Sequence, residues 1–190
     1  MLRFECASAP LAIILAMAGI FAACGQVQAV PGHNSPQHSS QDVIAKLGLT
    51  PSDEKGFFHE TFRDPTLLLG TNRSINTAIY YLLEGSEGQS LWHRLDAAEV
   101  WHYYAGAPLT LFLSSDDGST CEQHLMGSDI FAGQEPQVVI PKRKWQSAKS
   151  WGEWTLVGTT VSPAFVPEGF ELAPTGWAPD GGCNTTKPCR

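Results

Sequence analysis

Short runs of β-branched and aromatic residues, separated by turn residues, recur along the middle of this chain. Such runs are typical of β-strands, and the Gly, Pro and Asp residues between them are typical of tight turns. We expect strands at 57–63, 77–83, 99–104, 109–114, 137–140 and 154–162. Because the strands do not alternate with long helical segments, the pattern predicts an all-β sandwich or barrel rather than a parallel α/β sheet.

One short helix is expected before the first strand, where Val43, Ile44 and Leu47 follow helical spacing and Gly48 ends the segment. A chain of 190 residues suits one domain with a real core. Its 43% hydrophobic and 16% charged content is that of a globular protein. The net charge is −7 and the longest basic run is 142–144, so binding to nucleic acid is not expected.

The stretch 90–106 combines two histidines, an arginine and a carboxylate with four aromatic residues. A turn at 96–98 would fold His93 back towards Glu99. An imidazole and a carboxylate within reach of each other can hold a metal ion or exchange a proton. Because side chains alternate along a strand, His102 is expected on the face opposite Glu99 unless a bulge intervenes.

This stretch also resembles a known family. The spacing from Glu99 to Gly106 resembles the second half of the first cupin motif, and His93 aligns with the first histidine of that motif. Leu95 stands at the second histidine position and cannot bind a metal. The chain is most similar to a family of small single-barrel cupins with the pattern S-x-x-HR-x-x-x-x-E-x-WH-x-x-x-G-x-PL, which residues 90–109 match.

The resemblance extends over residues 43–173 and implies a cupin jelly-roll β-barrel with one short N-terminal helix. It also implies a pocket for a small-molecule ligand and a homodimer formed through sheet edges. In the second cupin motif, P-x-G-x-x-H, Arg143 replaces the glycine and Gln146 replaces the histidine. Lys55 replaces the first glycine of an earlier Gly-Gly pair. Glycine permits a positive φ, so arginine is expected to strain or reshape the turn at 143, and a neutral glutamine is a poor ligand for transition metals.

The expected strand 57–63 carries two charged residues that the family pattern also has, Glu60 and Arg63. Strict alternation places Glu60 on one face of the strand and Arg63 on the other. Charged residues on strands usually face solvent, but the match to the family makes both of them candidate pocket residues.

The catalytic candidates are His93, Glu99 and His102, where Glu99 or His102 exchanges a proton and His93 is the partner. The same three residues are the candidate metal ligands. Arg73 and Arg94 could hold an anionic or carbonyl oxygen through their bidentate guanidinium groups, with an ion pair to a nearby acid as the alternative for Arg73. The candidate substrate-binding residues are Glu60, Arg63, Arg73, Tyr80, Arg94, Trp101, Trp145 and Gln146.

Residues 1–29 resemble a secretory signal, with an apolar core at 11–23 that is short for a membrane span and a small-residue cleavage site before Val30. Secretion is the expectation. A lipid anchor near Cys24, or a cytoplasmic protein with a misassigned start, are the alternatives. The rest of the chain divides into a polar linker at 30–41, the cupin domain at 42–173 and a loose Pro/Gly-rich tail at 174–190.

Removal of that signal leaves three of the five cysteines, and an odd number argues against a full disulfide framework. Cys183 and Cys189 are close in sequence and could pair in an oxidising compartment. Cys121 would then be unpaired.

Three functions remain open. The first is a metal-independent isomerase, epimerase or cyclase that acts on a small metabolite, such as one of secondary metabolism, and needs no cofactor. The second is a cavity that binds or stores a small ligand without chemistry. The third is an oxygenase or lyase with a divalent metal on His93, Glu99 and His102. The sequence names no substrate.

Overall fold

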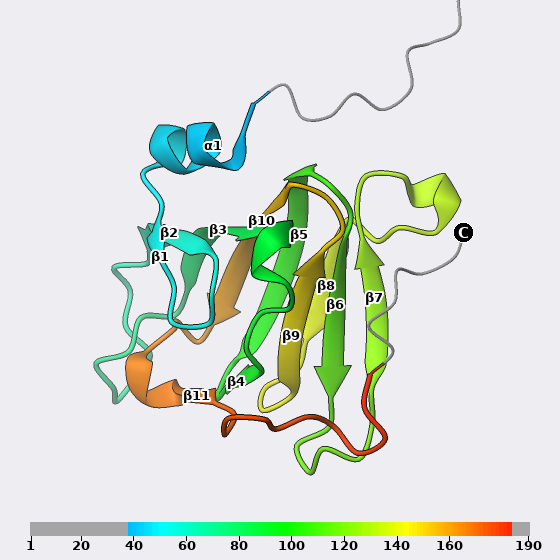
Figure 1. Ribbon diagram of the computed structural model, residues 1–190. Helices are drawn as coiled ribbons and strands as arrows, with labels where there is room; N and C mark the ends of the chain where they lie inside the picture. The colour runs from blue at the N-terminus through cyan, green and yellow to red at the C-terminus, as the bar shows by residue number, and fades with distance from the viewer. Residues whose placement is uncertain (1–37, 184–190) are drawn as a thin grey trace, which may run out of the picture. The chain divides into compact units, whose positions relative to one another are not determined.

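The computed structural model describes residues 38–183, which form an all-β body with one short helix (Figure 1). The helix is α1 (Ser40–Leu47). The strands are β1 (Thr50–Pro51), β2 (Phe57–Arg63), β3 (Thr77–Glu84), β4 (His93–Leu95), β5 (Ala98–Gly106), β6 (Leu109–Ser114), β7 (Glu122–Met126), β8 (Gln137–Ile140), β9 (Trp145–Ser150), β10 (Trp154–Ser162) and β11 (Phe170–Leu172). Short 3₁₀ turns lie at Gly85–Glu87, Ile130–Ala132 and Pro167–Gly169.

The strands form two antiparallel sheets. The six-stranded sheet has the order β1-β2-β3-β10-β5-β8, and the five-stranded sheet has the order β11-β4-β9-β6-β7. Strands far apart in the sequence are neighbours, since β10 lies between β3 and β5 (Figure 1). This is the predicted jelly roll, built as two sheets that do not close into a continuous barrel.

The core lies between the inward faces of the two sheets. Along β3, Tyr81 and Leu83 point inwards because successive side chains alternate between faces. Trp101 of β5 packs edge-on against Tyr81, with ring centroids 5.7 Å apart. The other fully or nearly buried members are Leu109, Leu111, Leu113, Met126, Val138, Ile140, Ala148 and Val157. Burial of each Leu-sized side chain contributes about 1.5–3 kcal/mol.

Helix α1 has the predicted place and the expected glycine at its end. Ser39 and Asp42 form a capping box at its start, and Gly48 ends it at φ 63°. Its apolar side packs on a small cluster that includes Leu82 and Trp154. The helix begins at Ser40, so the predicted linker ends slightly earlier than expected.

The pairing suggested for Cys183 with Cys189 was wrong. Cys121 forms a disulfide with Cys183, and the two Cα atoms lie 5.7 Å apart. Sequence proximity favoured Cys189 as the partner of Cys183, but the chain after β11 runs back past the loop before β7. Cys189 itself lies outside the described residues.

The predicted loose tail is packed as far as Cys183. The ring of Trp177 lies 4.7 Å from the ring of Trp145 and 5.4 Å from that of Trp92. The amide N–H of Asp180 donates to the carbonyl of Gly118 at 2.8 Å.

The predicted signal at 1–29 lies outside the described residues, as does most of the linker. Within 38–183, no helix is long and apolar enough to cross a membrane.

Candidate functional site

A cavity of about 760 Å³ opens beside β2, between the two sheets. Its volume is in the range that usually holds a small organic ligand. The lining combines apolar and aromatic walls with a few polar groups. The lining residues are Thr50, Pro51, Ser52, Asp53, Glu54, Phe58, Glu60, Arg63, Thr77, Ile79, His93, Leu95, Glu99, Thr159, Val161, Phe165, Pro167 and Phe170.

Glu99 is the buried carboxylate of this cavity, with 6% of its surface exposed. It lies on the inward face of β5, directly across from Val161 of β10. The side-chain amide of Gln146 donates to its Oε2 at 2.7 Å. Burial raises the pKa of Glu99, although the positive charge of His93 and the hydrogen bonds from Gln146 and Thr159 partly oppose the rise.

His93 is the second buried ionisable group, and 5% of it is exposed. Its Nδ1 lies 2.8 Å from Oε2 of Glu54 and 3.2 Å from the carbonyl of Leu91. Burial alone would lower the pKa of His93, but the carboxylates of Glu54 and Glu99 outweigh burial and raise it. His93 and Glu99, which were expected to approach each other, both line the cavity, and the charge of each shifts the pKa of the other.

Glu54 is a cavity residue that was not predicted from the sequence. The turn that carries it is fixed by Lys55 and Gly56, at φ 76° and 70°. The Lys55 ammonium donates to the carbonyls of Glu87 and Gln89 at 2.8 and 3.0 Å, which holds a side chain in a backbone region that favours glycine. The sequence feature that could have identified Glu54 is an acidic residue directly before this turn.

A bulge in β2 brings Glu60 and Arg63 to the same face. The pairing with β3 shifts between Glu60 and Phe62, so Glu60 lies across from Ile79 and Arg63 lies across from Thr77. The expectation that these two residues occupy opposite faces was therefore wrong, and both line the cavity. Their side chains form a two-point ion pair, with Nε–Oε1 at 2.9 Å and Nη2–Oε2 at 2.6 Å.

His102 lies on the other face of β5. Its Nε2 is 3.4 Å from the hydroxyl of Thr160, and it does not line the cavity. The irregularity in the β5–β10 pairing falls at Leu156 and Val157, beyond His102, so no bulge turns its ring towards Glu99. His102 therefore cannot contact a ligand held beside Glu99, which corrects its assignment as a catalytic residue or metal ligand.

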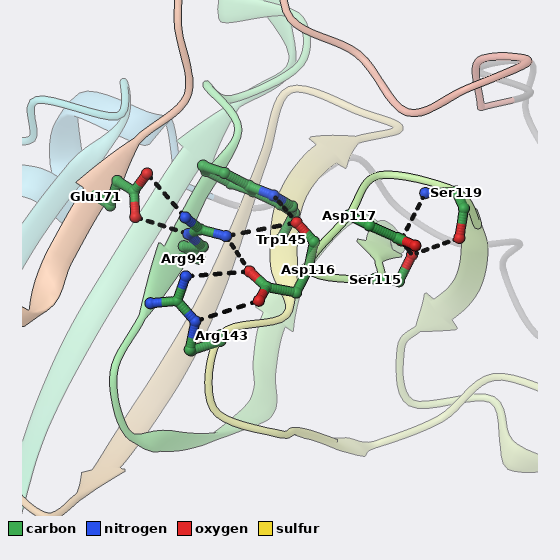
Figure 2. A network of polar contacts seen from close by, with 8 residues as sticks. All are labelled: Arg94, Ser115, Asp116, Asp117, Ser119, Arg143, Trp145 and Glu171. Atoms are coloured by element: carbon green, nitrogen blue, oxygen red, sulfur yellow. Dashed lines mark hydrogen bonds and ion pairs between the residues drawn. The ribbon is translucent and has the colours of Figure 1, made fainter.

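Arg94 and Trp145 belong to a polar cluster away from the cavity (Figure 2). The Arg94 guanidinium binds Glu171 at 2.7 and 2.9 Å, contacts Asp116, and lies 4.2 Å from the centre of the Trp145 ring. Arg143 also reaches Asp116, at 3.2 Å. Because Glu171 and Asp116 bind its guanidinium, Arg94 is placed to hold β11 and the loop between β6 and β7 rather than to bind a ligand in the cavity.

Three further substrate-binding candidates lie outside the cavity lining. Arg73 forms the ion pair that was its alternative interpretation, with both Nη atoms 2.8 Å from Asp96. Tyr80 packs edge-on against Tyr104, with ring centroids 6.0 Å apart. Trp101 is buried in the core between the sheets. These positions give none of the three a direct contact with a ligand in the cavity.

Gln146 does not line the cavity, but it acts on it through Glu99. It lies across from His93 in the β4–β9 pair, at the position where the cupin pattern has a metal-binding histidine. It is 1% exposed, and its Oε1 has no hydrogen-bond partner within residues 38–183. A buried amide oxygen without a partner is energetically unfavourable. The hydrogen bond from the amide nitrogen to Glu99 therefore sets the orientation of this side chain.

The donors present do not fit the metal site that the cupin resemblance implies. Nδ1 of His93 faces Glu54, and Gln146 presents its amide N–H to Glu99 instead of offering a nitrogen or carboxylate ligand. Leu95 occupies a further ligand position. Across residues 38–183, no three His, Cys, Asp or Glu side chains are arranged to hold a metal ion.

Arg143 adopts φ 65° at the glycine position of the second motif. The expected strained turn is therefore present. Its amide donates to the carbonyl of Leu95 at 2.6 Å, and its side chain reaches Asp116. Lys55 and Arg143, which replace glycines of the family pattern, thus both keep the positive φ that glycine favours.

Comparison with known proteins agrees with this fold. The family model described as "Cupin superfamily (DUF985)" matches residues 41–173. A crystal structure of a protein from Shewanella oneidensis is 32% identical, with a TM-score of 0.67 over 72% of this chain and 85% of that one. A hypothetical protein from Leishmania major is 27% identical, with a TM-score of 0.64 over 70% of this chain and 86% of that one.

No functionally curated protein matches the chain. The family match covers most of the sequence and all of the cavity-lining residues, and the Shewanella protein shares its fold along nearly its whole length. The chain therefore belongs to the cupin superfamily, in the family described as DUF985.

Proposed function

We propose that this cupin is a metal-independent enzyme that moves a proton within a small organic molecule, as isomerases, epimerases and cyclases do. One observation carries the proposal: a buried carboxylate with a raised pKa, Glu99, shares a ligand-sized cavity with a histidine whose orientation is fixed by a second carboxylate. Pairs of ionisable groups of this kind suit proton transfer near neutral pH.

The geometry supports distinct roles for the two groups. Nδ1 of His93 donates towards Glu54, which leaves Nε2 as the nitrogen available to a ligand. Ionised Glu99 accepts a proton from the ligand, while His93 donates a hydrogen bond or a proton to an oxygen on which charge develops. Return of the proton at another atom completes an isomerisation, so no oxidant or reductant is needed.

The walls of the cavity suit this chemistry. Phe58, Phe165 and Phe170 contribute aromatic surface around the polar groups. Apolar walls exclude water and strengthen electrostatic interactions inside the site. They also provide most of the contact area for a small ligand.

The test is proton exchange on candidate substrates. A panel of small carbonyl compounds and sugars is incubated with the protein in D₂O, and loss of C–H signals is followed by NMR. Glu99→Gln should slow exchange by about 10²–10⁴-fold, the usual contribution of a positioned general base. His102→Gln is the matched control and should leave exchange unchanged, because His102 lies outside the cavity. Exchange that persists in Glu99→Gln, or no exchange with any compound, refutes the proposal.

A non-catalytic ligand-binding protein is the second candidate. The observation that favours it is that the protein itself already partners both groups, Glu99 through Gln146 and His93 through Glu54. A binder would show saturable ligand affinity without exchange, and Glu99→Gln would then change only affinity.

The disulfide between Cys121 and Cys183 supports our proposal that the protein works in an oxidising compartment, as secretion would provide. The homodimer implied by the cupin resemblance remains a prediction. Light scattering coupled to gel filtration would measure it.

A further inference from the structure

The cations that line the cavity are already paired. Arg63 binds Glu60 at two points and also donates to the carbonyl of Phe165 at 3.2 Å. His93 binds Glu54 at 2.8 Å. Among residues 38–183, Arg63 and His93 are the Arg, Lys or His side chains in the lining. A ligand anion would therefore have to displace a carboxylate from its partner.

The remaining charges are negative. Asp53 lines the cavity and is exposed to solvent, and its carboxylate has no hydrogen bond or ion pair with any part of the chain that the structure describes. Glu99 adds a second negative charge whenever it is ionised. Since Glu54 and Glu60 balance the two cations, the lining carries a net charge of −1 or −2 in the states with His93 protonated, and a more negative charge when it is neutral.

The arginines that could have reversed this balance lie elsewhere. Arg73 is bound to Asp96, and Arg94 is bound to Glu171 and Asp116. Neither contributes to the lining. Arg73 and Arg94 were expected to hold an anionic ligand group. That expectation was wrong, because both side chains lie outside the cavity lining and both are paired with carboxylates.

Aromatic walls favour the same sign of ligand. Phe58, Phe165 and Phe170 line the cavity, and the rings of the last two are packed 6.0 Å apart. The faces of aromatic rings attract cations, and the ring surface also accommodates apolar groups.

We propose that the ligand of this cavity is a small organic cation, an amine with an apolar or aromatic body, and that anions are excluded. This inference rests on the proposed function only in taking the cavity as the ligand site. The ammonium group lies towards Asp53 at the exposed side, and the apolar body lies between the phenylalanine rings.

The test uses three probes with the same ring and different charges: benzylamine, benzyl alcohol and benzoate. Each is titrated into the full chain at pH 7 and low ionic strength, with binding measured by calorimetry or NMR. The expected order of affinity is benzylamine, then benzyl alcohol, then benzoate. Benzoate binding as tight as benzylamine, or binding of none of the probes, overturns the proposal.

Charge variants locate the effect. Asp53→Asn should weaken benzylamine by about two- to fivefold, as expected for an exposed ion pair, and leave benzyl alcohol unchanged. Asp180→Asn is the matched control, because Asp180 is also exposed but does not line the cavity. Equal losses in the two variants would overturn the assignment of Asp53. A benzoate affinity that falls in Arg63→Gln would show that Arg63 is free to bind anions and would overturn the exclusion.

The outcome is separable from that of the proposed function. If the probe order holds but Glu99→Gln still exchanges protons, the enzyme proposal fails and this inference stands. If Glu99→Gln loses exchange but benzoate binds best, this inference fails and the enzyme proposal stands.

Discussion

Removal of the disulfide between Cys121 and Cys183 should strongly destabilise the fold. The two cysteines are 62 residues apart, and the bond closes that segment into a loop in the unfolded chain. The loop-entropy relation gives a stabilisation of about 4 kcal/mol for a loop of this size. The estimate is an upper value, because structure that persists in the unfolded chain lowers the entropy that the bond removes.

Urea unfolding measures this effect. The oxidised protein is compared with the double variant Cys121→Ser, Cys183→Ser, and unfolding is followed by tryptophan fluorescence. With a urea dependence of about 2 kcal/mol/M, the expected shift of the midpoint is about 2 M. Cys189→Ser is the matched control and should leave the midpoint unchanged.

Two results would refute this reasoning. One is a loss below about 1 kcal/mol, which would mean that the bond adds little to the packing of Trp177 and its neighbours. The other is a peptide map of the oxidised protein that links Cys183 to Cys189 instead of Cys121.

The part of the stability that depends on Glu99 and His93 should fall as the pH rises, because the folded state raises the pKa of Glu99 above 4.5 and the pKa of His93 above 6.5. The contribution of each group to the free energy of unfolding is complete below its unfolded pKa and is lost as the pH passes its folded pKa. Glu99→Gln should therefore flatten the dependence of stability on pH from pH 4.5 upwards. Equal pH dependences in the variant and the parent protein would contradict this. Gln146→His should gain bound transition metal by elemental analysis relative to the parent protein prepared identically, because it supplies the missing imidazole; a metal content already stoichiometric in the parent would contradict our assessment of the donors. Arg143→Gly should be more stable than Arg143→Ala by about 1 kcal/mol in urea unfolding, because φ is 65° there and alanine keeps the strain; equal stabilities would show that the turn relaxes.

Six of the eleven strands within residues 38–183 were predictable because their signals are local, whereas β1, β4, β7, β9 and β11 were not predicted. Each of the six expected strands overlaps a strand of the structure, and helical spacing together with Gly48 placed the helix. The presence of His93 and Glu99 in one cavity also follows from local sequence, since the turn between β4 and β5 lies within one short segment. Alternation along β5 correctly separated His102 from Glu99.

The rest of the site depends on contacts between distant parts of the chain. Glu54 lies between β1 and β2 of the six-stranded sheet, and His93 lies in β4 of the five-stranded sheet, so their contact depends on the packing of the two sheets. No spacing rule links these two positions. The partner of Cys183 was missed for the same reason. The side-chain direction of Arg63 depends on an irregularity in the pairing of β2 with β3, which the composition of β2 does not reveal.

That irregularity has a consequence for which side chains this wall of the cavity presents to a ligand. Beyond the bulge, one extra residue in β2 decides whether Arg63 or Phe62 faces the ligand. A regular pairing that kept every residue would place Thr61 across from Ala78 and Phe62 across from Thr77. It would turn the guanidinium out and a phenyl ring in, without altering the identity of either residue. Glu60 would then face the cavity without its cation, and the site would become both more acidic and more apolar. The pairing of β2 with β3, and not residue type alone, therefore decides which side chain this wall presents to a ligand.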